Sequence, residues 1–408
     1  MLVPPLVERI FKIPSEFTSE AKRALWITSL TFPLTFVSGS LSGLFAAVQR
    51  FDLVNIVKVL NSISIYLAGI LCVYLNQNIP FIIITVLIAK ILVLILQFII
   101  ARHLVPTFFK SRPSLRILKR VAGFAGWITL SNLINPLMFY VDRFLIGATL
   151  SMSALTYYSV PFDLAARLWV ISTSLTMALF PAFATLLAKG DGEKTCDYFV
   201  KSIKFLVMVS GPIVCLMLAF SRTILDLWLG AEFANQSTMV LQILLISTLF
   251  DYPGIIATTL LEGAGNPRVL AIAKMAYLPI HAIIAFSALR LFGLAGAAMA
   301  IFVMRLIYAV LFTEVAMRML SMEKSYLLSR LFPAYFSITL FAIASILLDY
   351  WASPLNLLYL LMLGFGLVGL YSMMAWMLVL DVSERLFIRT TISALLERSI
   401  LKKSATRN

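Results

Sequence analysis

Long apolar runs follow one another along nearly the whole chain, with only short polar segments between them. A helix needs roughly 20 apolar residues to cross a bilayer core that is about 30 Å thick, and each run is about that long. Because the runs are continuous rather than alternating, they predict helices and not the strands of a membrane β-barrel. We expect eleven membrane-spanning helices, near residues 25–48, 56–75, 81–101, 122–149, 155–187, 203–221, 237–261, 270–290, 294–317, 331–349 and 355–380.

The composition indicates the same class. Hydrophobic residues make up 61% of the 408 residues and charged residues 13%, and the mean hydropathy is +0.97. Soluble domains contain about 25% charged and about 45–50% apolar residues. We therefore expect an all-α protein that crosses a membrane many times.

The distribution of charge predicts how the chain is oriented. The net charge is +14, and Lys and Arg gather in alternate connections, as they do in cytoplasmic loops. This pattern predicts a multi-pass protein of the cell membrane with a cytoplasmic C-terminus, and it makes nucleic acid a poor candidate partner. The basic segments are 102–120, 188–204, 318–330 and the tail, whereas 76–80 and 350–354 carry no charge.

Counting back from the tail through eleven helices places residues 1–24 outside, although this amphipathic segment carries four basic residues. A basic outer segment conflicts with the usual charge rule, so either a span is miscounted or the N-terminal bundle lacks helices. A weak internal repeat favours the second explanation, with about three helices missing. Residues 44–58 (LFAAVQRFDLVNIVK) and 260–274 (LLEGAGNPRVLAIAK) each predict a helix end, a polar turn and a helix start.

These features predict five regions. An amphipathic extracytoplasmic segment (1–24) precedes the rest of an N-terminal helix bundle with a basic cytoplasmic linker (25–120). A C-terminal six-helix bundle (121–317), two additional membrane helices (318–380) and a basic cytoplasmic tail (381–408) follow. Transporters are often built from such repeated bundles, with the substrate bound near the middle of the membrane.

Charged side chains at membrane depth are the candidate functional residues, because each costs roughly 2.5–3.5 kcal/mol to insert. Asp142 and Arg143 are adjacent, Asp163 and Arg167 share a helical face, and Pro136 and Pro161 interrupt the two helices. The candidate substrate contacts are Arg143, Arg167, Lys90, Arg305, Asn132 and Asn135, and the candidate gating or ion-coupling groups are Asp142, Asp163 and Asp251. The charges expected at the cytoplasmic mouth are Arg50, Asp52, Lys58, Glu262, Arg268 and Lys274.

A purely structural interpretation of the same charges stays open. Asp163 or Asp142 would then pair with Arg167, and Asp251 would pair across the bundle with Lys90 or Arg305.

The chain lacks the motifs of soluble catalysis. It has no GxxxxGK[ST], GxSxG or HExxH sequence, and its connections are too short for a catalytic domain. Three scattered cysteines and only two histidines, His103 and His281, argue against a metal site or a histidine proton relay. We expect no cofactor, no metal and no enzymatic activity.

Six stretches carry a resemblance to a known family, and the region 126–184 is the most specific. They are LFAAVQRFDLVN (44–55), GWITLSNLINPLMFYVDRFLIG (126–147), YYSVPFDLAARLWVISTSLTMALFPAFA (157–184), ILDLWLGAEFA (224–234), LLEGAGNPR (260–268) and FGLAGAAMAIFVMRL (292–306). In these residues the chain resembles the polysaccharide transporter family of the multidrug/oligosaccharidyl-lipid/polysaccharide exporter superfamily, which includes the Wzx-type O-antigen flippases.

The resemblance implies two MATE-like helical bundles around a cavity, of which the N-terminal one is incomplete here. It also implies a flippase that carries polyprenyl-pyrophosphate-linked oligosaccharide, such as an O-antigen, capsule or exopolysaccharide repeat unit, across the membrane by alternating access. Arginine and lysine in the cavity would receive the pyrophosphate. Membrane lipids and other polysaccharide assembly proteins are the further candidate partners. The alternatives are a cation-coupled multidrug antiporter, a flippase of peptidoglycan lipid precursors, and an integral glycan polymerase or ligase.

Overall fold

The computed structural model describes residues 18–106 and 133–385, except 49, 77, 135, 266, 353–356 and 382–383, together with Gly126. Every regular element in this part of the chain is a helix, and eight of the helices are long and apolar enough to cross a membrane. The expected class, an all-α polytopic membrane protein, is confirmed. Backbone contacts divide the chain into two compact units, Met1–Ala122 and Gly123–Asn408.

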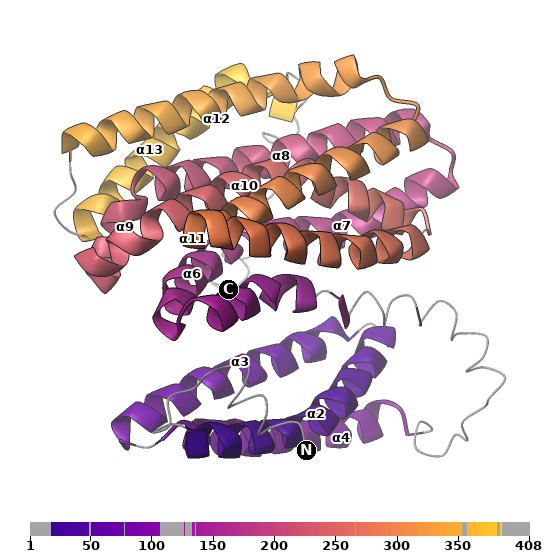
Figure 1. Ribbon diagram of the computed structural model, residues 1–408. Helices are drawn as coiled ribbons and strands as arrows, with labels where there is room; N and C mark the ends of the chain where they lie inside the picture. Colours follow the sequence, from indigo (N-terminus) through magenta and orange to yellow (C-terminus); the bar gives the residue numbers. More distant parts are fainter. Residues whose placement is uncertain are drawn as a thin grey trace, which may run out of the picture. The chain divides into compact units, whose positions relative to one another are not determined.

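The N-terminal unit contains α2 (Thr18–Ala47), α3 (Phe51–Tyr74) and α4 (Ile79–Leu104), which contact one another (Figure 1). Its small apolar core includes Phe45 and Ala101. Gln97 of α4 is fully buried, accepts a hydrogen bond from Ser38 Oγ at 2.7 Å and donates one to Ser42 Oγ at 3.1 Å. A buried amide costs free energy unless it is hydrogen-bonded, so these contacts favour one register of α4 on α2.

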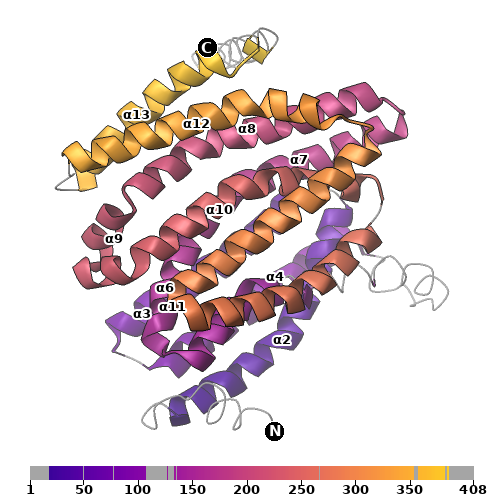
Figure 2. The same cartoon turned by 45° about the horizontal axis from the view of Figure 1, so that its top comes forward.

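The C-terminal unit is a bundle arranged around α10. After a helical stretch at 136–149, it contains α6 (Met152–Ala166), α7 (Trp169–Ala188), α8 (Gly192–Ala219), α9 (Ser221–Leu229), α10 (Ala231–Gly263), α11 (Pro267–Met319), α12 (Lys324–Ala352) and α13 (Leu357–Leu378). α10 contacts α6, α7, α8, α9 and α11, whereas α12 lies against α8 and α13 packs on both (Figures 1 and 2).

Gly293 turns α11 back on itself. Its backbone has φ 59° and ψ −142°, a conformation that glycine adopts far more readily than other residues. A Cβ at Gly296 would overlap the carbonyl oxygen of Ala288, so the two halves of α11 approach closely beside the turn (Figure 2). α11 therefore contains the two separate spans expected on either side of this glycine.

Other element boundaries differ from the expected ones. The span expected at 155–187 is divided at Arg167 and Leu168, where several backbone N–H groups bond three residues back and tighten the helix. α8 begins about ten residues before its expected start because Asp191 caps it, accepting a hydrogen bond from Lys194 N at 3.2 Å. The short helix α9 was not expected, since it is only nine residues long.

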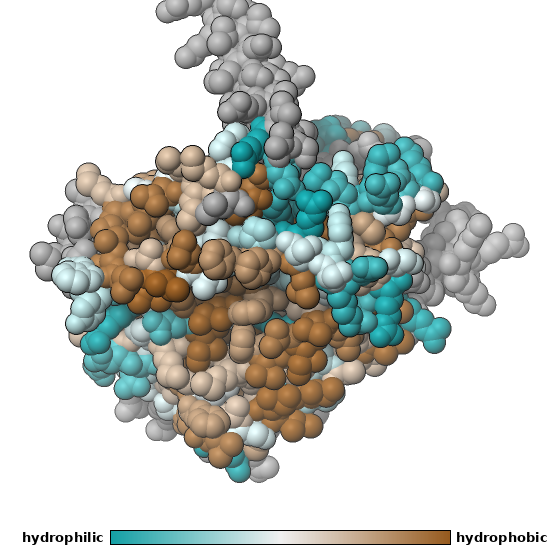
Figure 3. Space-filling model, turned by 90° about the horizontal axis from the view of Figure 1, so that it is seen from above, coloured by the Kyte–Doolittle hydropathy of each residue, from teal (hydrophilic) through white to brown (hydrophobic). Residues whose placement is uncertain are grey.

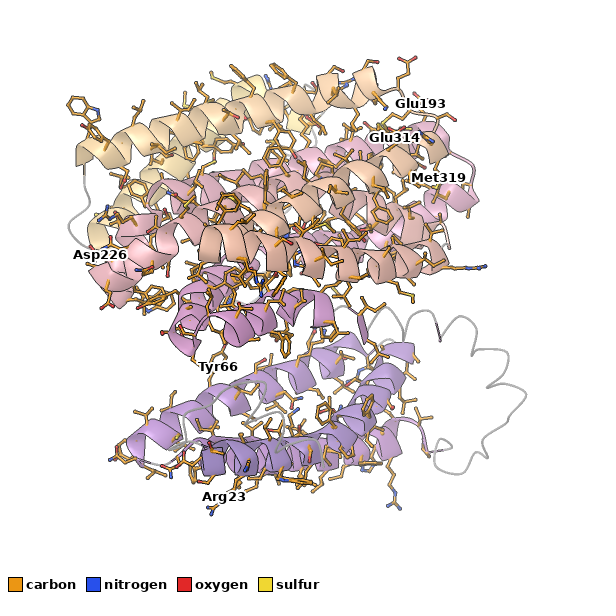
Figure 4. The ribbon with its side chains drawn as sticks, viewed as in Figure 1. Arg23, Tyr66, Glu193, Asp226, Glu314 and Met319 are labelled. Carbon is orange, nitrogen blue, oxygen red and sulfur yellow. The ribbon has the colours of Figure 1, made fainter. Side chains whose placement is uncertain are left out.

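The surface of the C-terminal unit is that of a membrane protein. Figure 3 shows broad apolar areas with hydrophilic residues gathered mainly to one side. Along α12 the side chains of Leu328, Phe332, Phe336, Leu340 and Leu347 are all exposed, at helical spacing. In Figure 4, Glu193 and Glu314 lie at one end of the bundle and Asp226 at the opposite end. An exposed apolar band between charged ends fits a bilayer.

Candidate ligand pocket in the C-terminal unit

A pocket of about 440 Å³ lies among the helices of the C-terminal unit. Four helical stripes, each two turns long, supply most of its lining, and Met138, Phe139 and Phe162 complete it. The spacing of three and four residues within each stripe places its members on one helical face. The stripes are Trp169, Ser172, Thr173 and Thr176 on α7; Asp251, Ile255 and Thr258 on α10; and Lys274, Tyr277, His281, Ile301, Arg305 and Tyr308 on the two halves of α11.

The pocket crosses the middle of the bundle. Arg305 and His281 are each 14 residues from the end of α11 on their side, which corresponds to about 21 Å of helix. Lys274 is seven residues from that end, or about 10 Å. Because the bilayer core is about 30 Å thick, the charged pocket spans its central part and extends toward one surface.

Arg305 is the best-held cation of the pocket. Its Nη1 donates to Ser247 Oγ at 3.0 Å, and its guanidinium carbon lies 5.0 Å from the centre of the Trp169 ring. Its Nε is 3.9 Å from Asp251 Oδ2, too far for a hydrogen bond. Arg305 therefore lies beside Asp251, as the structural interpretation of these charges predicts. Arg305 therefore keeps N–H donors that are not hydrogen-bonded to a carboxylate.

Asp142 and His281 form a second, fully enclosed pair. Each side chain is only 1% exposed, and His281 Nε2 lies 2.9 Å from Asp142 Oδ1 without the alignment of a hydrogen bond. Within the described residues, neither the two carboxylate oxygens of Asp142 nor Nδ1 of His281 has a hydrogen-bond partner. His281 also stacks on Tyr277, with ring centres 5.5 Å apart. His281 faces the pocket, whereas Asp142 lies behind it.

Arg143 pairs with Asp163, and not with a residue of its own helix. Its Nη2 donates to Asp163 Oδ1, and its guanidinium carbon lies 4.8 Å from the centre of the Phe162 ring. The alternative pairings of Arg167 with Asp163 or Asp142 are therefore not found, because Arg143 and His281 occupy those carboxylates. Arg167 is exposed and does not line the pocket.

The other candidates lie elsewhere or outside the described residues. Lys90 belongs to the N-terminal unit, where its Nζ donates to Thr35 Oγ1 at 3.2 Å. Asn132 and Asn135 lie outside the described residues. The expected mouth charges lie at the ends of α2 and α10 and the starts of α3 and α11; Arg50 and Asp52 pair at 2.8 Å, and Lys58, Glu262 and Arg268 are exposed.

The sequence interpretation missed three important pocket residues. His281 was set aside because the chain has so few histidines, Lys274 was assigned to the mouth, and Tyr277 was not considered. Their spacing at 274, 277 and 281 is the signal that would have found them, because it forms a polar stripe within an apolar helix. Among the described residues, no three His, Cys, Asp or Glu side chains come together as a metal site would require.

Comparison with known proteins identifies the family of this chain. Residues 5–238 match the family model described as "Polysaccharide biosynthesis protein". The chain belongs to this family. The match confirms the family resemblance seen in the sequence, that of the Wzx-type polysaccharide flippases.

Two similar proteins add detail. A Shigella flexneri protein named "Putative O-antigen transporter" is 22% identical over 290 residues, which cover 70% of this chain and 68% of the relative. The solved structure of the lipid II flippase MurJ in an inward closed conformation has a similar fold, with a TM-score of 0.67 and 12% identity. That similarity covers 92% of this chain and 81% of MurJ.

Proposed function

We propose that this protein is a flippase that moves a polyprenyl-pyrophosphate-linked oligosaccharide across the cell membrane by alternating access. The observation that carries the proposal is the pocket of the C-terminal unit, where Arg305 and Lys274 line a mainly apolar and aromatic cavity within the bundle. The substrate would be the repeat unit of an O-antigen, a capsule or an exopolysaccharide. The family and the Shigella relative's name support this direction.

The lining suits both parts of such a headgroup. Arginine and lysine bind phosphate oxygens through charge-assisted hydrogen bonds, which are stronger than neutral ones. Trp169, Tyr277 and Tyr308 offer aromatic rings, and the hydroxyls of Ser172 and Thr173 can bond sugar hydroxyls. The volume of about 440 Å³ is within the range of about 300–1,000 Å³ for small-molecule pockets. It holds the pyrophosphate and the nearest sugar, while the lipid tail stays in the bilayer.

The remaining charged candidates have secondary roles in this proposal. Arg143 and Asp163 form a pair that opens when the headgroup passes, and Asp142 and Asp251 hold the pocket cations in place. Lys90, in the N-terminal unit, stays a candidate substrate contact. Arg167 is exposed and is the weakest candidate for substrate contact.

Two alternatives use the same fold. A flippase of peptidoglycan lipid precursors would share the pyrophosphate pocket, and the MurJ-like fold fits it equally well. A cation-coupled multidrug antiporter would need a pocket with uncompensated carboxylates, whereas Asp251 here lies 3.9 Å from Arg305 and Lys274 also lines the pocket. The pocket therefore favours an anionic substrate.

A genetic complementation test decides between these functions. In a strain that makes a surface polysaccharide but lacks its own flippase, this chain should restore the polymer if it carries that repeat unit, and Arg305→Ala should abolish the restoration. Arg318→Ala is the matched control, because Arg318 is on the same helix and 79% exposed. Restoration of growth in a strain depleted of its lipid II flippase, without surface polymer, would establish the peptidoglycan alternative.

The proposed orientation has its own test. We propose a cytoplasmic C-terminus, so the turn between α7 and α8 at residues 189–191 should lie in the cytoplasm. A reporter that is active only in the cytoplasm, inserted after Gly190, should be active. Activity of a periplasmic reporter at the same position would reverse the orientation.

A further inference from the structure

We propose that His281 is a third phosphate-binding cation of the pocket, held by Asp142, and that it takes up a proton when the anionic ligand binds. This inference rests on the proposed function and deepens it. It assigns a role to the buried pair of Asp142 and His281.

An entering anion shifts the charge balance of the pocket further toward the protonated imidazole. Lys274 and Arg305 supply two positive charges, and Asp251 and Asp142 supply two negative ones, so these groups cancel when His281 is neutral. An entering pyrophosphate adds at least two negative charges. A proton on His281 offsets part of this excess in a site of low dielectric constant, where Coulomb interactions are strong.

The geometry identifies the nitrogen that receives the proton. His281 Nε2 is the ring nitrogen beside Asp142, 2.9 Å from Oδ1, so we place the hydrogen of the neutral imidazole on Nε2 and the lone pair on Nδ1. Nδ1 has no hydrogen-bond partner within the described residues. When it takes a proton from solution, Nδ1 becomes a donor for a phosphate oxygen. Nε2 stays beside Asp142.

The groups that face the pair come from every helix around it. Tyr158 on α6 is fully buried, and its hydroxyl has no hydrogen-bond partner in the described part of the chain. Tyr277 on α11 stacks on the imidazole, and Arg143 and Arg305 act electrostatically on the same cluster.

The linkage has a definite sign. A group that binds a proton more strongly in the complex makes binding tighter at low pH and weaker as the pH rises. If one proton is fully coupled, affinity falls by up to about tenfold per pH unit.

The test measures proton uptake on binding of farnesyl pyrophosphate to the full chain in detergent, purified without a polyhistidine tag. Isothermal titration calorimetry in buffers of different ionisation enthalpy, between pH 6 and 8, gives the number of protons bound. Wild type should take up as much as one more proton than His281→Gln. The difference between the two proteins removes the contribution of the ligand's own ionisation. His103→Gln, the matched control in the N-terminal unit, should behave as wild type.

The outcomes separate this inference from the proposed function. If His281→Gln binds the probe with the proton uptake of wild type, the inference is wrong and the proposed function stands. If neither wild type nor Arg305→Ala binds farnesyl pyrophosphate at any pH, the inference and the proposed function both fail.

A second measurement keeps the inference testable if His281→Gln does not fold. In His103→Gln the remaining histidine is His281, so ¹⁵N-histidine labelling reports on it alone. Addition of farnesyl pyrophosphate at pH 7.5 should shift its ring nitrogens toward imidazolium values. Unchanged ring nitrogens in a protein that binds the probe would overturn the inference.

Discussion

Replacement of Arg305 tests the pocket most directly. The guanidinium is 13% exposed and is held by Ser247, by the Trp169 ring and, more loosely, by Asp251. Arg305→Ala removes the cation, whereas Arg305→Lys keeps the charge but loses the planar fork that matches phosphate oxygens. The two variants therefore separate charge from geometry.

The expected loss of affinity follows from one charge-assisted hydrogen bond. Such a bond contributes about 1.5–3 kcal/mol, and a tenfold change in affinity corresponds to about 1.4 kcal/mol. Arg305→Ala should weaken binding of farnesyl pyrophosphate by about tenfold to about 150-fold, with Arg305→Lys in between. The free energy of unfolding should fall by about 1–3 kcal/mol, because Asp251 is left without its cation.

A double variant separates ligand binding from folding. Arg305→Ala combined with Asp251→Asn removes both charges, so it should recover most of the lost stability and none of the lost affinity. Binding is measured by calorimetry at constant pH, with farnesol as the uncharged probe and Arg318→Ala as the control variant. Wild-type affinity in the double variant would refute the assignment of Arg305 as a phosphate ligand.

Three further predictions concern the fold. Gly293→Ala should lower the free energy of unfolding by about 1–3 kcal/mol, since glycine adopts φ 59° with ψ −142° far more readily than alanine, and Gly192→Ala, with free space and ordinary φ, should change it little. Gly254→Ala should cost about 1–3 kcal/mol, because its Cβ would meet the α11 backbone at 2.8 Å; an unchanged melting temperature would contradict this packing. Lys204 is buried, and its Nζ lies 2.7 Å from Glu384 Oε2. Lys204→Met should lower the free energy of unfolding by about 3 kcal/mol, and adding Glu384→Leu should reverse much of that loss. A double-mutant cycle of thermal unfolding measures both effects.

Apolar run length predicted the helices well, because the cost of exposing backbone polar groups in lipid leaves a long apolar segment little choice but a helix. The glycine at 293 was also visible as the division between two spans. Features that depend on local hydrogen bonds could not be predicted from the apolar pattern. α9 and the tightened turn at Arg167 come from capping and backbone contacts that hydropathy does not record.

The candidate site shows the same division. The sequence by itself determined that Asp142, Arg143, Asp251 and Arg305 are costly charges within an apolar bundle, and therefore functional candidates. Only the tertiary structure decided their partners, because the rotation of each helix about its axis sets which stripes face one another. That rotation joined Asp142 to His281 and Arg143 to Asp163, and it placed Arg305 in the pocket while leaving Arg167 outside.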